Sequence, residues 1–172
     1  MTRTTLIALA LLVGVGQGAA AANPAVETLG AFQDWSAFAF TENGQRVCFV
    51  QSKPTSSEPK GARRGAINTL VTHRPAEKAT DVVSILMGYP LRPGSDVEVE
   101  VDGQKFKLFV DGEAAWAPDA RTDSALAEAF AKGSKASVKG VSTRGTRTTD
   151  TYSLSGFTAA SNAIAKGCNI KR

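Results

Sequence analysis

The sequence predicts an all-β protein, an antiparallel sandwich or barrel of about seven or eight strands with two short helices, one of them C-terminal. Two turn dipeptides, Asn43-Gly44 and Asp102-Gly103, each separate two runs with the residue pattern of strands. Such dipeptides favour two-residue hairpin turns, because both central positions of a type I′ turn need positive φ. Further short runs of period two recur along the chain with turn signals between them.

The first residues have the composition of a secretory signal peptide. Arg3 supplies a positive charge, residues 6–15 are apolar, and the small residues Ala20-Ala21-Ala22 precede Asn23. A segment of this kind is too short to cross a bilayer as a permanent helix. We therefore expect a signal peptide over residues 1–22 and one domain over residues 23–172. The mature protein is expected in the periplasm, with association with the outer envelope or secretion as alternatives, and with no transmembrane segment after cleavage.

The Asp102-Gly103 turn predicts the register of a hairpin. Pairing outward from it places Glu100 opposite Lys105 and Glu98 opposite Lys107. The other face of the hairpin then carries four apolar side chains: Val97, Val99, Phe106 and Leu108. Opposite charges in such pairs contribute about 0.2–1 kcal/mol each, and a slip of one residue would bury all four charges.

The Asn43-Gly44 turn predicts a second hairpin, from strands at 32–40 and 46–52, in which Ala39 faces Cys48. Both faces of this pair are apolar, so we expect both to be covered. Residues 23–30 are expected to form a loose leader, and residues 53–65, with two prolines and two glycines, an exposed loop.

The rest of the chain predicts four more strands and two helices. The strands are expected at 66–72, 81–87, 135–142 and 150–155, with residues 111–118 in a loop. The first helix is expected at about 124–132, with Asp123 or Ser124 as its cap and Gly133 at its end. The final helix is expected at 157–166.

The two cysteines, Cys48 and Cys168, predict a disulfide in an exported protein. This bond would close a loop of roughly 120 residues and constrain the unfolded chain by up to about 4–5 kcal/mol. Two free buried thiols are the alternative.

No catalytic or metal-binding pattern emerges from the sequence. The single histidine, His73, stands beside Arg74 and Pro75, and we expect it to be solvated in a turn. Asp111, Glu113 and Asp119 cluster in one loop, but their spacing fits no calcium loop. Nucleophile-elbow and phosphate-loop motifs are absent. We therefore expect no enzyme, no cofactor and no metal.

Basic residues on predicted loops remain as candidate contacts. Arg63, Arg64, Arg144 and Arg147 are the candidates, with Lys60 nearby in the sequence. They would contact anionic lipid headgroups, polysaccharide or a protein partner; the alternative is that they serve solubility alone. The formal net charge is only +4. Nucleic-acid binding would need a concentrated basic face with interleaved aromatic residues, and the sequence shows none.

Short motifs between Phe32 and Ile164 carry a family resemblance. In chain order they are Asp34-Trp35, Cys-Phe-Val-Gln at 48–51, Leu-Arg-Pro-Gly at 91–94, Val-Glu-Val at 97–99, the helix at 124–132, and Tyr-Ser-Leu-Ser-Gly-Phe-Thr-Ala-Ala at 152–160. The chain thus resembles the invasion-associated locus B family of exported alphaproteobacterial proteins. The resemblance implies a periplasmic or outer-envelope β protein without known catalytic residues.

The chain departs from the family pattern at its cysteines. Members of the family typically carry a Cys four residues after the early Trp, where this chain has Ala39, and a Cys pair after the central hairpin, where residues 111–115 have none. The resemblance implies a lost cross-strand bridge, which leaves Cys48 to pair with Cys168 or to stay free.

Three functional hypotheses follow from the sequence. The leading one is a non-enzymatic envelope protein that acts through its surface on an envelope or host component, which is a protein or an envelope polymer. The second is a periplasmic carrier or sensor that holds a small apolar ligand inside a barrel. A hydrolase with an unrecognised site is the third.

Overall fold

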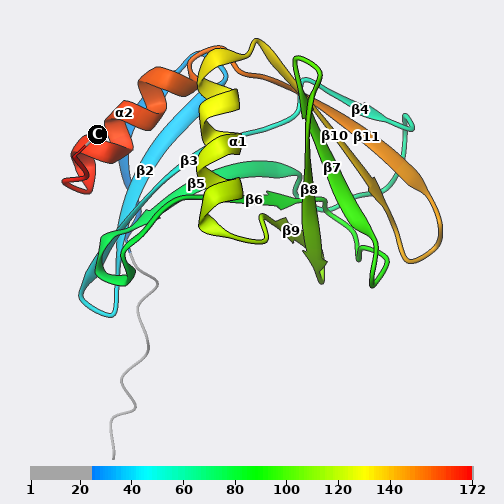
Figure 1. Ribbon diagram of the computed structural model, residues 1–172, viewed down its shortest axis with the longest axis horizontal. Coiled ribbons are helices and arrows are strands. Elements are labelled where there is room, and N and C mark those ends of the chain that lie inside the picture. The colour runs from blue at the N-terminus through cyan, green and yellow to red at the C-terminus, as the bar shows by residue number, and fades with distance from the viewer. Residues whose placement is uncertain (1–24, 172) are drawn as a thin grey trace, which may run out of the picture.

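The structure is a computed structural model that describes residues 25–171, so the predicted signal peptide at 1–22 lies outside the described residues. It forms one antiparallel sheet of eleven strands with two α-helices and one short 3₁₀ helix (Figure 1). The elements are β1 (Glu27–Phe32), β2 (Trp35–Glu42), β3 (Gln45–Ser52), β4 (Ser56–Glu58), β5 (Asn68–Arg74), η1 (Pro75–Glu77), β6 (Ala79–Leu86), β7 (Asp96–Val101), β8 (Gln104–Asp111), β9 (Ala114–Trp116), α1 (Ala120–Lys132), β10 (Lys135–Val141), β11 (Arg147–Ser153) and α2 (Phe157–Gly167). Neither α1 nor α2 is long and apolar enough to cross a membrane.

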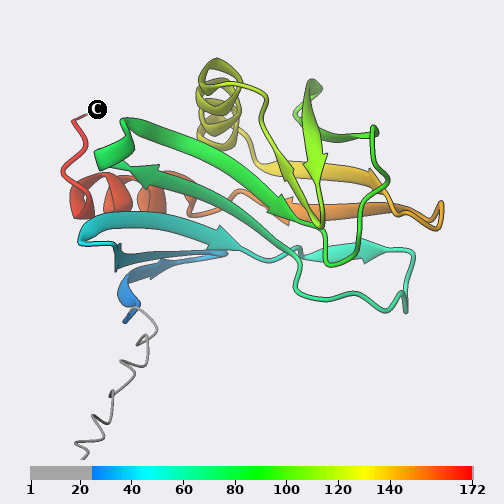
Figure 2. The same ribbon diagram turned by 90° about the horizontal axis from the view of Figure 1, so that it is seen from below.

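The strand order across the sheet is β1-β2-β3-β5-β6-β9-β8-β7-β10-β11-β4, and the sheet is open, with β1 and β4 at its edges. It bends strongly, as two perpendicular views show (Figures 1 and 2). The start of β2 approaches the end of β11, where the Trp35 indole N–H donates to the carbonyl of Ser153 over 3.0 Å. The all-β class is confirmed, but the sheet is not a closed barrel.

Three strands were not predicted, which raises the count from about eight to eleven. β1 falls in the expected leader, β4 in the expected exposed loop, and β9 in the loop expected at 111–118. Two of them, β4 and β9, have three residues each, and β4 pairs with β11 across a long sequence separation. Only β4 depends on a distant partner alone, because β1 pairs with β2 and β9 pairs with β8, their neighbours in the chain, as well as β9 with β6. The strands were missed because such short or irregular segments show no clear alternation.

One face of the sheet and both helices form the core. Helix α2 packs on β1, β2 and β3, while α1 packs on β6. Trp35, Phe130 and Phe157 meet where the helices cross this face, with ring centroids 4.9–6.1 Å apart. All three side chains are about 1% exposed, so the inner face is filled by the protein's own side chains.

Both predicted hairpin registers are confirmed. Ala39 faces Cys48 in the β2–β3 pair, and Glu100 faces Lys105 in the β7–β8 pair. Some ion pairs, however, are diagonal: Lys107 lies 3.5 Å from Asp96, and Lys105 lies 3.2 Å from Glu98. Diagonal neighbours in a sheet lie within reach of long side chains, so the lysines bind acids two residues from the positions directly opposite them.

The first helix begins earlier than predicted. Asp119 is its N-cap and accepts a 2.7 Å hydrogen bond from the Thr122 N–H, so neither Asp123 nor Ser124 caps it. Asp123 lies inside the first turn, where its carboxylate accepts a 2.7 Å hydrogen bond from the Val83 N–H of β6. The predicted end at Gly133 is confirmed, and α2 matches its prediction within one residue.

Candidate functional site

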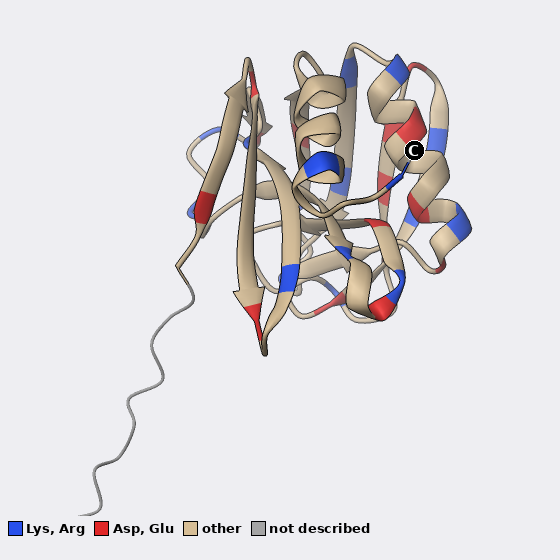
Figure 3. Ribbon diagram, turned by 90° about the vertical axis from the view of Figure 1, so that its left-hand side faces the viewer, with Lys and Arg blue, Asp and Glu red and all other residues tan. Residues whose placement is uncertain are grey.

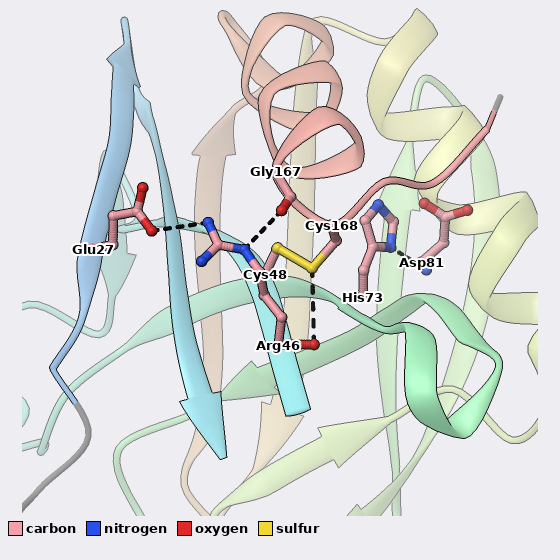
Figure 4. The surroundings of a disulfide bond; sticks show 7 residues. All are labelled: Glu27, Arg46, Cys48, His73, Asp81, Gly167 and Cys168. Carbon is pink, nitrogen blue, oxygen red and sulfur yellow. Dashed lines mark hydrogen bonds and ion pairs between the residues drawn. A yellow bond between two sulfur atoms is a disulfide. The ribbon is translucent and has the colours of Figure 1, made fainter. Parts of the chain in front are cut away.

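The single histidine lies in the core, contrary to the prediction. His73 is fully buried in β5, and its Nδ1 accepts a 3.0 Å hydrogen bond from the Asp81 N–H (Figure 4). The predicted solvated turn is wrong because β5 continues to Arg74, and Pro75 begins a 3₁₀ helix after it. The imidazole is therefore one of the buried groups between β3 and α2, with no access to the surface.

The predicted disulfide is confirmed. Cys48 in β3 is bonded to Cys168 directly after α2, with the sulfurs 2.03 Å apart (Figure 4). Both residues are buried, at 0% and 5% exposure. Arg46 reinforces the same junction, because its Nε donates to the Gly167 carbonyl over 2.7 Å. These bonds fasten the C-terminal helix to the sheet.

The acidic loop residues do not form a metal site. Asp119 caps α1, and its hydrogen bond from Thr122 holds the pKa of its carboxyl below the ordinary value. Asp111 and Glu113 lie exposed on the turn between β8 and β9. Within residues 25–171, no group of three or more His, Cys, Asp and Glu side chains is placed to hold a metal ion.

Arg64 lies inside the protein, unlike the other candidate arginines. Its guanidinium forms a two-pronged ion pair with Asp150 of β11, with distances of 2.7 and 2.6 Å, and it also donates to the Met87 carbonyl. The side chains of Arg64 and Asp150 are 6% and 0% exposed. The guanidinium also lies 5.0 Å from the ring centroid of Tyr89. Arg64 thus anchors the loop after β4 and does not present its charge to solvent.

Four other arginines gather on three neighbouring segments, and we call them the arginine end: Arg63, Arg92, Arg144 and Arg147. The turn between β10 and β11 is hydrogen-bonded to the turn before β7, with Arg92 N–H to Val141 oxygen at 2.9 Å. The Arg92 guanidinium lies over that turn, because a Cβ placed on Gly145 would come within 3.1 Å of its Nη2.

The loop that carries Arg63 reaches the same end. It follows β4, whose Glu58 pairs with Thr149, two residues beyond Arg147 in β11. Both views place the β10–β11 turn and the loop after β4 at the end opposite α2 (Figures 1 and 2). Side chains of β7, β10 and β11, Arg147 among them, line a hollow of about 310 Å³ there.

The four guanidinium groups of the arginine end are exposed and, within residues 25–171, form no ion pair. The opposite end differs. There Arg46 lies 2.8 Å from Glu27, and Arg74 lies 2.5 Å from Glu42. Figure 3 faces that end and shows acidic and basic residues interspersed over it. Exposed lysines such as Lys78 and Lys166 at that end also lack an ion pair in the described part of the chain, but its arginines, Arg46 and Arg74, are both paired, whereas those of the arginine end are not.

Sequence reasoning missed one member of the arginine end. Arg92 stands between Leu91 and Pro93 in a turn rich in proline and glycine, and this setting alone could have marked it as exposed. Its place beside Arg144 depends on contacts between turns about fifty residues apart, which no local pattern predicts.

The outer face of the β2–β3 hairpin is less covered than predicted. Phe38, Phe40 and Phe49 remain partly exposed and cover one another, with Phe38 and Phe49 stacked at 5.2 Å. Both α-helices lie on the other face of the sheet, which explains the difference. On the same outer face, Phe109 is 50% exposed.

Comparisons with known proteins agree on one family. The family described as "Invasion associated locus B (IalB) protein" matches residues 35–165, which is more than half of the chain. A crystal structure of invasion associated protein B from Bartonella henselae has a TM-score of 0.59 with 15% sequence identity, and the match covers 83% of this chain and 97% of that one. At this identity the likeness shows the fold alone. No curated protein matches the chain.

Proposed function

Since the chain belongs to the invasion-associated locus B family, we propose that it is an exported envelope protein that acts by binding a partner through its surface, without catalysing a reaction. The partner is an anionic component of the envelope or of a host surface, and the arginine end is the contact.

The free charge of the arginine end is the observation that carries this proposal. Arg64, Arg46 and Arg74 are each paired with a carboxylate of the same chain. Among the described residues, Arg121 on α1 stands alone without an ion pair, whereas the four arginines of the arginine end lack one together. Exposed like charges that gather without internal partners create a positive potential that attracts anions. A partner that supplies the missing anions would complete this surface.

The carrier hypothesis has less support. A carrier for a small apolar ligand needs room on the inner face of the sheet. In residues 25–171 that face is packed with buried side chains, among them Val50, Ile85 and Leu108, each at 0% exposure. The hollow of about 310 Å³ lies instead beside charged and hydroxyl side chains near the arginine end.

Site-specific photo-crosslinking tests the proposal. A photoreactive residue replaces Thr143, which is exposed next to Arg144, and a matched one replaces Lys166 on α2 at the opposite end. In intact cells we expect envelope adducts from position 143 and none from position 166. Combined Arg144→Gln and Arg147→Gln substitutions should abolish the adducts at 143. Equal labelling from both positions, or labelling that ignores the substitutions, would overturn the proposal.

A further inference from the structure

We infer that the arginine end docks on a membrane surface by binding the phosphodiester headgroups of anionic lipids. This inference rests on the proposed function and names the chemistry of its partner. It draws on the type of side chain, on the arrangement of these side chains, and on the acids beside them.

The side-chain type favours phosphate. Each member of the arginine end carries a planar guanidinium, which presents N–H groups in a fork that matches two oxygens of a phosphate. In the described structure these forks are not occupied by carboxylates, so they are available to an external anion. Arg64 shows the same fork used internally, with two oxygens of Asp150 at 2.6–2.7 Å.

The arrangement favours an array of anions over a single one. The arginines come from three segments: the loop after β4, the turn before β7, and the β10–β11 turn with the first residue of β11. Arg92 lies over the β10–β11 turn, whereas Arg63 reaches this end from the far side of β11. Side chains spread over the surface in this way match headgroups spaced across a membrane plane.

An exposed aromatic ring stands close to this surface. Phe109 is 50% exposed and pairs across the sheet with Asp96, which lines the same hollow as Arg147. Exposed aromatic side chains beside basic residues are typical of interfacial membrane contact, where the ring enters the headgroup boundary. Phe109 therefore supplies an apolar contact next to the electrostatic one.

Two carboxylates near the arginine end form no ion pair within residues 25–171, whereas Asp96 and Glu98, which line the hollow with Arg147, are paired with lysines. Asp111 and Glu113 lie exposed on the turn between β8 and β9, which adjoins the turn before β7 through a 2.9 Å hydrogen bond from the Leu91 N–H to the Gly112 carbonyl. They form no ion pair with the arginines in the described structure. Near an anionic membrane these acids are repelled by the surface. Their neutralisation should therefore strengthen binding, whereas neutralisation of the arginines should weaken it.

Vesicle co-sedimentation of the mature full-length protein is the experiment. We expect binding to vesicles that contain phosphatidylglycerol and none to vesicles of phosphatidylcholine alone, with loss at high salt. Each Arg→Gln change at positions 92, 144 and 147 should lower partitioning about fivefold. Asp111→Asn with Glu113→Gln should raise partitioning, and the matched control Lys166→Gln, at the opposite end, should leave it unchanged.

Three results would overturn the inference: equal binding to both kinds of vesicle, binding that the Arg→Gln variants leave intact, or a preference for soluble polygalacturonate over phosphatidylglycerol vesicles. Thermal unfolding of each variant confirms that it is folded. If crosslinking at position 143 captures an envelope protein while the vesicles fail to bind, the inference is wrong and the proposed function stands. Failure in both experiments rejects both.

Discussion

The buried ion pair between Arg64 and Asp150 offers the sharpest test of how this fold is held together. In Arg64→Met the aspartate keeps its place in the middle of β11 but loses its counter-charge, and the Met87 carbonyl loses its donors. Removal of one partner from a buried pair costs about 3–5 kcal/mol, because an uncompensated charge remains. Asp150 is 0% exposed, so we expect a cost toward the upper end of this range.

The reverse change should cost less. In Asp150→Asn the unpaired charge is that of Arg64, which stands on a loop with exposed residues on both sides of it. A long side chain on a surface loop can turn its charged head to water. We therefore expect Asp150→Asn to lose less stability than Arg64→Met, even though the same pair is broken.

Urea unfolding at neutral pH measures both changes, together with the single variant Asp150→Leu and the double variant Arg64→Met/Asp150→Leu, which close a double-mutant cycle. The double variant leaves no buried charge, so it should be more stable than Arg64→Met alone and show a coupling energy of about 2 kcal/mol or more. A loss below about 1 kcal/mol in Arg64→Met would refute the argument, because that is the effect of an exposed pair. Additive losses in the double variant would refute it as well.

Three further predictions concern other points of the fold. Gly156→Ala should destabilise the protein by about 3 kcal/mol in thermal unfolding, because the φ of Gly156 is +92° and a Cβ there would overlap a backbone carbonyl. The control Gly61→Ala, at φ +74° with open space around it, should cost about 1 kcal/mol. Replacement of Cys48 and Cys168 together by alanine should cost about 2–5 kcal/mol in urea unfolding, and an unchanged midpoint would contradict a structural role for the disulfide. Burial raises the pKa of Asp123, so its folded form holds the proton more tightly than the unfolded form, and stability falls as the pH rises through the folded pKa. Asp123→Asn keeps an acceptor for the Val83 N–H without the buried charge. Its urea midpoint should therefore exceed that of the natural protein at neutral pH but not in acid below about pH 4. An equal difference at both pH values would contradict this reasoning.

Local pattern was sufficient for the two central hairpins. Asn43-Gly44 and Asp102-Gly103 combine a turn signal with strand patterns on both sides, and both registers are confirmed residue by residue. The short strand β9 follows β8 through a two-residue turn at Gly112-Glu113, but its three residues are too few to show alternation, and it also pairs with the distant β6. The sheet is therefore predictable where a turn lies between two strands long enough to show their pattern, and unpredictable where a strand is very short, as in β9, or pairs only with a distant strand, as in β4.

The neighbours Arg63 and Arg64 show the same limit at the candidate site. In sequence they are equivalent members of one loop with the composition of an exposed segment. Arg64 is buried and Arg63 is exposed because Asp150, 86 residues from Arg64, occupies a buried position that needs a counter-charge. Gly65 and Gly88 let the loop approach closely enough, since a Cβ on Gly88 would lie 2.8 Å from the Gly65 oxygen. The residues around Arg64 in the sequence indicate neither its pairing with Asp150 nor the close approach of Gly65 to Gly88.

Stability alone does not account for the arginine end. Like charges at one end of the molecule repel one another, so they add nothing to the stability of the folded state. The chain pairs other arginines with carboxylates, as at Arg46, Arg64 and Arg74, so internal compensation is available to this fold. At the arginine end the nearby acids are engaged elsewhere or left unpaired: Asp96 pairs with Lys107, and Glu58 with Lys60. The anionic partner that we propose would supply the compensation that the described chain does not.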